Sequence, residues 1–212
     1  MLHYYIKKIQ YFILKKKFGF SQTSIDTYFS NKKTTVLSFS SIFWAARAAQ
    51  INEFFHLTKK YNVIFIKDTS RSWFNNLDLV TIKKNIKTKT NYCIGYSMGG
   101  FNAIMFSNFF PIKKVIAFSP QFSIHPSLSK DKTYLNYAAR IKKWKYKQLK
   151  FNNKTKYLLI FGSSKNEKYH ASKIPNQKNI KIITIDGCDH ATAPFLKKEK
   201  KLKKLISEFF EN

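Results

Sequence analysis

The segment NYCIGYSMGGFNAIMF, residues 91–106, holds three of the six glycines in a chain of 212 residues. Gly95, Ser97 and Gly99 form the pattern G-x-S-x-G. An apolar β-type run precedes this pattern, and a helical run that stops at Pro111 follows it. On so sharp a strand-to-helix turn the serine hydroxyl is exposed, and glycines two residues to either side avoid a steric collision. The segment therefore predicts a nucleophile elbow with Ser97 at its tip.

Short apolar runs alternate with helical patterns on both sides of this turn. The apolar runs predict strands at 34–40, 62–68, 91–95, 113–119, 156–162 and 180–186. Helical patterns occupy 44–60, 77–89, the segment after Ser97 and the C-terminal tail. Continuous apolar strands that alternate with helices are typical of an α/β fold. The expected architecture is a mostly parallel sheet of about six strands with helices on both faces.

One segment breaks the alternation between the fourth and fifth strands. Residues 120–153 form a long stretch with a basic, aromatic helical pattern at 134–150, which predicts a helical insertion that acts as a lid or cap over the sheet. We find no internal repeat and no linker. The expected organisation is therefore a basic amphipathic N-terminal segment at 1–33 and one α/β domain at 34–212.

The N-terminal segment has apolar residues at helical spacing, with lysines between them. Two interpretations stay open: a helix docked on the domain, or a basic aromatic helix in peripheral contact with an anionic membrane. Lysines break up the apolar residues of this segment, so no apolar run is long enough to span a membrane. No small-residue cleavage site precedes residue 20. The two cysteines form no CxxC pair, which suits a reducing compartment. We expect a cytoplasmic protein, with contact at the inner face of the membrane as a further expectation.

The formal net charge of +28 raises the question of a nucleic-acid partner. Only Arg47, Arg71 and Arg140 are arginines; the other basic residues are lysines. Phosphate sites favour the bidentate arginine fork, so the charge is interpreted mainly as a solvated lysine surface, and no specific nucleic acid is expected. An anionic membrane or an anionic substrate would fit the charge equally well.

The order of these features resembles the α/β-hydrolase superfamily, in its serine esterase and lipase-like members. The resemblance rests on a strand, GYSMGG and a helix, then an acid after the next-to-last strand and the "GCDH" histidine after the last strand, and it covers roughly 34–212. The family's first two strands are not evident before residue 34, so a shortened version of the fold is expected.

The resemblance implies a triad in the order serine, acid, histidine. Ser97 would be the nucleophile, and His190 the base that accepts its proton. Glu167 is the only carboxylate in the segment SSKNEKYHA after the fifth strand and would orient His190. Asp131, in the insertion, is the alternative acid. Neither a metal nor an organic cofactor is implied.

The oxyanion hole is expected to use two backbone amides. One would come from Met98, directly after the nucleophile. By resemblance the other would come from Ser41 or Ile42, in the loop after the first strand. Family members often have His-Gly there, and this chain has Ser40 and Ser41.

These roles predict a serine hydrolase that cleaves a carboxylic ester through an acyl-enzyme intermediate. The alternatives are an acyltransferase on the same triad, a non-catalytic binding member of the fold, and a protein that binds nucleic acid or membrane through charge alone. The substrate is expected to be a small-molecule, saccharide or lipid acyl ester. Aromatic residues of the insertion are expected to wall its pocket: Phe122, Tyr134, Tyr137, Trp144 and Tyr146.

Overall fold

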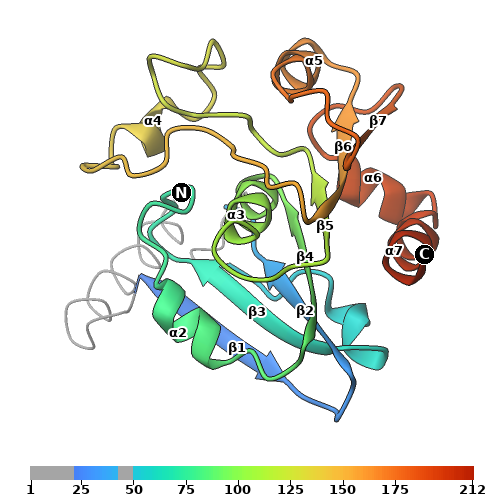
Figure 1. Ribbon diagram of the computed structural model, residues 1–212. Coiled ribbons are helices and arrows are strands. Elements are labelled where there is room, and N and C mark those ends of the chain that lie inside the picture. The colour runs from blue at the N-terminus through green and yellow to red at the C-terminus, as the bar shows by residue number, and fades with distance from the viewer. Residues whose placement is uncertain (1–21, 43–49) are drawn as a thin grey trace, which may run out of the picture.

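The computed structural model describes residues 22–42 and 50–212, which form one sheet with helices on both sides (Figure 1). The strands are β1 Thr23–Tyr28, β2 Thr34–Phe39, β3 Asn62–Asp68, β4 Thr90–Tyr96, β5 Lys114–Phe118, β6 Lys156–Gly162 and β7 Ile180–Ile185. The α-helices are α2 Leu79–Lys84, α3 Met98–Phe106, α4 Leu135–Ala138, α5 Lys165–Ser172, α6 Thr192–Lys198 and α7 Leu202–Glu211, and η1 Phe55–Lys59 is a 3-10 helix.

The sheet has the order β1-β3-β2-β4-β5-β6-β7. All neighbouring strands from β3 to β7 are parallel, and β1 pairs antiparallel with β3 at the edge. The predicted α/β architecture and each of the six predicted strands are confirmed. The count of about six was too low, because β1 lies inside the segment 1–33 that was expected to precede the domain. Its sequence, TSIDTY, is polar and largely exposed, so it lacks the apolar run that marks the other strands.

Alternate residues of the strands enter two separate cores, as the period of two in a strand requires. Cys93 packs against α3 on one face, together with Ile82 of α2. Its neighbour Ile94 packs on the other face, together with Ile206 and Phe210 of α7. Figure 1 shows α2 and α3 on one side of the sheet and α6 and α7 on the other. Both faces are thereby covered, as the continuous apolar strands predicted.

The predicted helix at 44–60 is wrong in the part that the structure describes. Residues 43–49 lie outside the described residues, as does the predicted N-terminal helix in residues 1–20. After residue 49 the chain forms only η1, and Phe54 before it is left-handed, with φ of 58°. The carbonyls of Ile51 and Glu53 accept hydrogen bonds from Ser40 and Ser38. The backbone here is therefore bonded to the strand β2 and its loop instead of to a helix.

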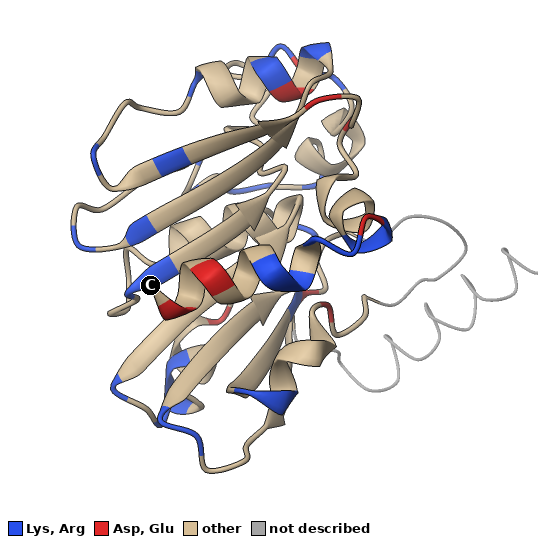
Figure 2. Ribbon diagram, turned by 90° about the vertical axis from the view of Figure 1, so that its right-hand side faces the viewer, with Lys and Arg blue, Asp and Glu red and all other residues tan. Residues whose placement is uncertain are grey.

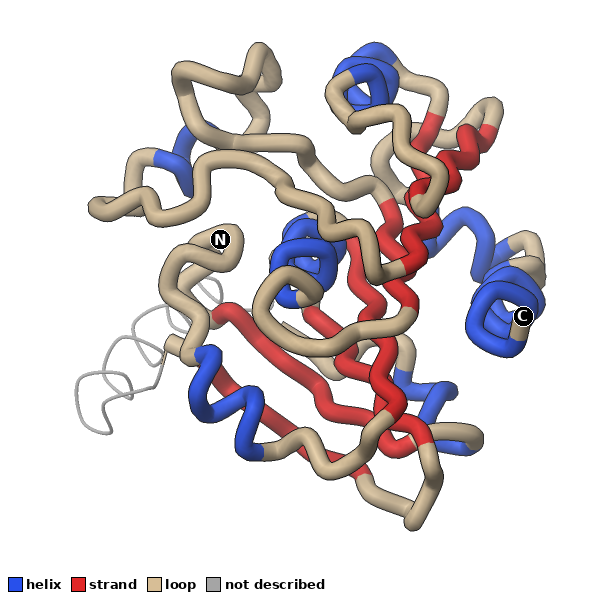
Figure 3. The backbone as a smooth tube through the Cα atoms, viewed as in Figure 1, coloured by secondary structure: helices blue, strands red, loops and turns tan. Residues whose placement is uncertain are grey.

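The insertion between β5 and β6 is mostly loop, which corrects the predicted helix at 134–150 (Figure 3). Only α4 is helical there. The backbone amides of Lys145 and Tyr146 donate to the Asn75 side chain, and the Leu149 amide donates to the Phe122 carbonyl. Partners elsewhere in the fold thus replace the intrahelical bonds that the local pattern favours.

In the part of the chain that the structure describes, no helix is both long and apolar enough to cross a membrane. Lysine and arginine are spread over strands, loops and helices of the side shown in Figure 2, and they are not gathered at one place.

Candidate active site

The predicted elbow is present between β4 and α3. Ser97 has φ of 56° and ψ of −123°, and its amide donates to the Phe118 carbonyl of β5 at 2.8 Å. A Cβ atom at Gly95 would lie 2.1 Å from the Gly99 carbonyl oxygen, and one at Gly99 would lie 2.1 Å from the Phe39 carbonyl oxygen. Only glycine fits at either position. The two glycines thus permit the turn that holds the Ser97 hydroxyl at the carboxyl edge of the sheet.

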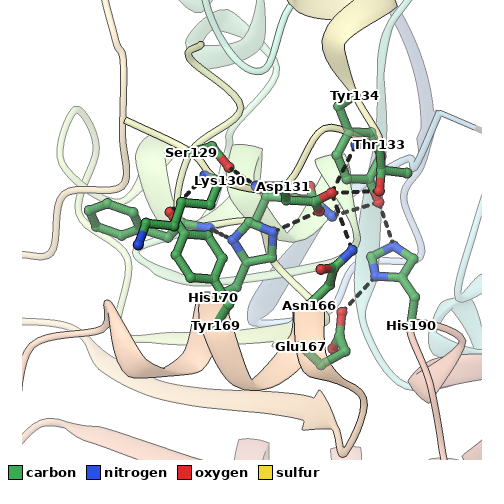
Figure 4. Close-up of polar contacts among 12 residues, drawn as sticks. Ser129, Lys130, Asp131, Thr133, Tyr134, Asn166, Glu167, Tyr169, His170 and His190 are labelled. Atoms are coloured by element: carbon green, nitrogen blue, oxygen red, sulfur yellow. Dashed lines mark hydrogen bonds and ion pairs between the residues drawn. The ribbon is translucent and has the colours of Figure 1, made fainter. Parts of the chain in front are cut away.

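The structure brings Ser97, His190 and Glu167 together in the predicted order. His190 follows β7, and its Nε2 lies 2.9 Å from Ser97 Oγ. Its Nδ1 lies 2.8 Å from Glu167 Oε1 (Figure 4). Glu167 is in the first turn of α5, and its second oxygen accepts the Gly162 amide at 2.9 Å. The carboxylate is buried and held at both oxygens, so it can fix the orientation of the imidazole.

Asp131, the alternative acid, contacts a different histidine. Its Oδ2 lies 3.1 Å from His170 Nε2, and both side chains are buried. The Phe122 amide donates to His170 Nδ1 at 3.2 Å, so the ring proton is assigned to Nε2, which donates to Asp131. Burial alone would raise the pKa of Asp131, but hydrogen bonds from His170 and Thr133 lower it to about 2. This second pair was not predicted from the sequence.

The two expected oxyanion amides have different surroundings. Met98 is the first residue of α3, so its N–H has no acceptor within the helix and lies at the positive end of the helix dipole. The Ser41 amide already donates to Glu53 Oε1 at 3.2 Å, and the Ser41 hydroxyl donates to the same oxygen. Within the described residues the Ile42 amide has no hydrogen-bond acceptor. Of the two alternatives, Ile42 is therefore the one whose amide is not engaged.

Glu53 is a further carboxyl group of the candidate site, and it was not predicted from the sequence. It lines the same cavity as Ser97. Burial raises its pKa to about 7, although the hydrogen bonds from Ser41 act in the opposite direction. Its Oε2 atom is buried and has no hydrogen-bond partner among the residues that the structure describes. The site therefore contains an acid that changes its charge near neutral pH.

A cavity of about 1100 Å³ opens beside Ser97 and His190. Its apolar lining includes Ile42, Ile51, Phe54, Phe55, Tyr96, Ala193, Pro194 and Leu202, and its basic lining includes His56, Lys197 and Lys203. The pKa of His56 is lowered by burial and by the charges of Lys203 and Lys197, which shows that these three groups lie near one another.

The expected aromatic wall of the cavity is largely wrong. Of the five insertion aromatics, only Tyr134 lines the cavity. The others are engaged elsewhere: Trp144 packs on His125, Tyr146 on Phe74 and Phe109, Tyr137 on Trp73, and Phe122 against the apolar core. The apolar wall comes instead from the segment after β2, from Tyr96 at the end of β4, and from residues of α6 and α7.

Two further polar side chains lie within hydrogen-bond distance of Ser97 and His190. Gln121 Nε2 lies 3.2 Å from Ser97 Oγ, and the Tyr134 hydroxyl lies 3.1 Å from His190 Nε2. Gln121 could have been found from the sequence, because it follows β5, the neighbour of β4, and parallel strands end at the same edge of a sheet. No such signal exists for the Tyr134 contact. No group of metal-binding side chains occurs within residues 22–42 and 50–212.

No protein-family model and no curated protein sequence matches the chain. Solved structures do match. The capsule O-acetyltransferase of Neisseria meningitidis serogroup A is 18% identical, with a TM-score of 0.64 over 89% of this chain and 92% of its own. MenH from S. aureus is 14% identical, with a TM-score of 0.54 over 91% and 98%. MGS-M2, an alpha/beta hydrolase enzyme from a deep-sea metagenome library, is 14% identical, with a TM-score of 0.57 over 90% and 94%. At identities this low the similarity shows only that these chains share a fold.

Proposed function

The chain has the α/β-hydrolase fold, and on that premise we propose that it is a serine hydrolase that cleaves carboxylic esters through an acyl-enzyme intermediate. The observation that carries the proposal is the continuous chain of hydrogen bonds from Ser97 Oγ to His190 at 2.9 Å and from His190 to Glu167 at 2.8 Å. A serine hydroxyl is a weak nucleophile unless a neighbouring base accepts its proton, and this chain of contacts supplies that base.

In the proposed reaction Ser97 Oγ attacks the ester carbonyl carbon, while His190 Nε2 takes the hydroxyl proton. Glu167 stabilises the resulting imidazolium. The amides of Met98 and Ile42 donate to the oxyanion. His190 then gives the proton to the leaving oxygen as the C–O bond breaks. A water molecule repeats the sequence on the acyl enzyme and releases the acid.

The cavity supports a proposal for the substrate class. Its apolar wall fits an acyl chain or an apolar alcohol, and His56, Lys197 and Lys203 fit an anionic group at some distance from the ester. A lipid-like acyl ester or an acylated anionic saccharide combines these features. Peripheral contact with an anionic membrane remains part of the same proposal, since a lipid substrate would be met there.

Transfer of the acyl group to a hydroxyl or thiol acceptor is the second candidate. The cavity of about 1100 Å³ has room for an acceptor beside an acyl group. The fold also occurs in a capsule O-acetyltransferase. Product analysis after incubation of an acyl donor with candidate sugar and thiol acceptors separates the two reactions: free acid supports hydrolysis, and an acylated acceptor supports transfer.

The triad is tested by labelling with a fluorophosphonate probe. We expect the wild type and Ser172→Ala, an exposed serine on α5, to be labelled and Ser97→Ala not to be labelled. His190→Gln and Glu167→Gln should label at least about a hundredfold more slowly, because each leaves Ser97 without a correctly oriented base. Equal labelling of the wild type and Ser97→Ala would refute the proposal.

A further inference from the structure

Two side chains outside the triad converge on its reacting atoms. The Tyr134 hydroxyl and Ser97 Oγ approach the same ring nitrogen, His190 Nε2, at 3.1 and 2.9 Å. Gln121 Nε2 lies 3.2 Å from Ser97 Oγ and 3.2 Å from the Tyr134 hydroxyl. Together these four polar groups form a closed cluster at the tip of the elbow.

The orientation of Gln121 is fixed by a buried tryptophan. Trp73 Nε1 donates to Gln121 Oε1 at 2.9 Å, which requires that the amide oxygen faces Trp73 and the amide nitrogen faces Ser97. The Ser119 carbonyl accepts from the same nitrogen at 3.2 Å. Both Trp73 and Gln121 are fully buried, and Trp73 adopts φ of 47°, an uncommon conformation for this residue. A strained residue that aims an amide at the nucleophile indicates a functional constraint.

Tyr134 is held in place by the second acid–histidine pair. It follows Thr133 directly, and both the amide and the hydroxyl of Thr133 donate to Asp131 Oδ1. Asp131 is in turn fixed by His170 of α5 (Figure 4). Burial raises the pKa of Tyr134, so its hydroxyl keeps its proton and remains a hydrogen-bond donor.

We propose that Tyr134 is a catalytic residue that donates a hydrogen bond to the leaving oxygen of the ester, and that Gln121 is the positioning residue that holds its hydroxyl. The inference rests on the proposed function. A leaving oxygen must come within hydrogen-bond reach of His190 Nε2 to receive its proton. The Tyr134 hydroxyl lies 3.1 Å from the same nitrogen, so it is on hand to donate to an oxygen that approaches Nε2 from its side.

The step balances without a further reactant. The C–O bond of the tetrahedral intermediate breaks, its electron pair goes to the leaving oxygen, and the proton on His190 Nε2 neutralises that oxygen. Tyr134 keeps its own proton and only shares it in a hydrogen bond. An alkoxide is a poor leaving group and needs the hydrogen bond from Tyr134. A p-nitrophenolate is a good leaving group and hardly needs it.

The test compares two esters of one acyl group, p-nitrophenyl butyrate and ethyl butyrate. For Tyr134→Phe we expect kcat/KM to fall roughly tenfold to a hundredfold on ethyl butyrate, the range for one hydrogen bond to a charged oxygen, and less than about threefold on p-nitrophenyl butyrate. Tyr137→Phe is the matched control, because Tyr137 packs on Trp73 but makes no hydrogen bond to Ser97, Gln121 or His190. The kcat/KM of Tyr137→Phe should equal that of the wild type on both esters.

If Tyr134→Phe fails to fold, Gln121→Met is assayed on the same two esters. It should lose more activity on ethyl butyrate than on p-nitrophenyl butyrate, because the Tyr134 hydroxyl loses the donor that holds it, whereas loss of the Gln121 contact with Ser97 would affect both esters alike. The double variant should depend on the leaving group little more than Tyr134→Phe alone, since both changes act on the Tyr134 hydroxyl.

An equal loss on both esters, or no loss on either, in a variant with the wild-type melting temperature would overturn the inference and leave the triad intact. Failure of the proposed function looks different: Ser97→Ala would then hydrolyse both esters as fast as the wild type.

Discussion

At the scale of single residues, unusual backbone conformations gather around the serine. Trp73, Phe74, Ser97 and Ser119 all have positive φ, between 45° and 72°, although none is a glycine. Each such residue costs on the order of 1–3 kcal/mol, so it persists only where the surrounding contacts determine its conformation. Here those contacts are specific: Ser97 donates to a β5 carbonyl, and Ser119 donates to a β6 carbonyl at 2.6 Å. Positive φ occurs elsewhere too, as at Asn31 and Lys200, but at Ser97, Ser119 and Trp73 it is combined with hydrogen bonds that fix the residue at the candidate site.

Glu53 provides a prediction for pH dependence. Its pKa of about 7 in the folded protein exceeds its ordinary value of 4.5, because the group is buried. Between these two values the folded protein keeps a proton that the unfolded chain has released, so the free energy of unfolding falls as the pH rises from about 4.5 to about 7. We expect Glu53→Gln to remove that fall, a difference on the order of 1–3 kcal/mol by pH 7.

Urea unfolding of the wild type and Glu53→Gln at a series of pH values measures the effect. Glu199→Gln is the control, because Glu199 is exposed and its replacement should leave the pH dependence as in the wild type. Parallel curves for the wild type and Glu53→Gln would show that Glu53 is not the titrating group.

At the scale of elements, α5 is the part that connects the triad to the insertion. Asn166, Glu167 and His170 lie within one turn of this helix; Glu167 contacts His190, and the other two contact Asp131 (Figure 4). A displacement of α5 would therefore move the triad acid and loosen the segment that carries Tyr134. The insertion thus contacts α5 through Asp131, and it contacts Ser97 and His190 directly through Gln121 and Tyr134.

Replacement of Asp131 tests this connection. Asp131→Asn should lower the free energy of unfolding by about 1–3 kcal/mol, because His170 and Thr133 lose a charged acceptor in a buried place. The rate of fluorophosphonate labelling should fall as well, since α5 carries Glu167, the proposed acid of the triad. Asp26→Asn is the control: Asp26 pairs with Lys67 on the surface, where an ion pair is worth at most about 1 kcal/mol. Urea unfolding measures both variants, and equal losses would contradict the connection.

At the scale of the whole molecule, the dominant feature is the excess of 39 lysines and arginines over 11 acidic residues. The lysine ion pairs of the described residues lie at the surface, as for Lys60–Glu211, Lys201–Glu199 and Lys204–Glu208. Such pairs stabilise little, and the remaining like charges repel one another. The fold is therefore expected to carry an electrostatic penalty that depends on ionic strength.

Salt should accordingly stabilise this protein. Raising the ionic strength from about 0.01 M to about 0.15 M shortens the Debye length from roughly 30 Å to roughly 8 Å, which screens the repulsion. We expect the melting temperature to rise by several degrees, as followed by circular dichroism at constant pH. Sodium chloride and potassium chloride should act alike, whereas a melting temperature that falls or stays constant would argue against net repulsion.

The sequence was sufficient for those features that depend on local pattern and chain order. Six strands have apolar runs, and Ser97, Glu167 and His190 follow three of them, so their meeting at one sheet edge was predictable. β1 was missed because an edge strand needs no apolar run. The helix predicted at 134–150 failed because distant side chains bind its backbone. The contact of Trp73 with Gln121 joins residues 48 positions apart, and no periodicity encodes it.

The last strand of the sheet has one unpaired side. Within the described residues β7 pairs only with β6, so the backbone groups on its other edge face no further strand. Its sequence, IKIITI, would accept a second molecule in edge-to-edge pairing, and Ile182 is 41% exposed. Lys181 and the mutual repulsion of two cationic molecules oppose this association. The lysine-rich surface that is expected to lower the stability of each folded molecule is therefore also expected to oppose aggregation through this strand.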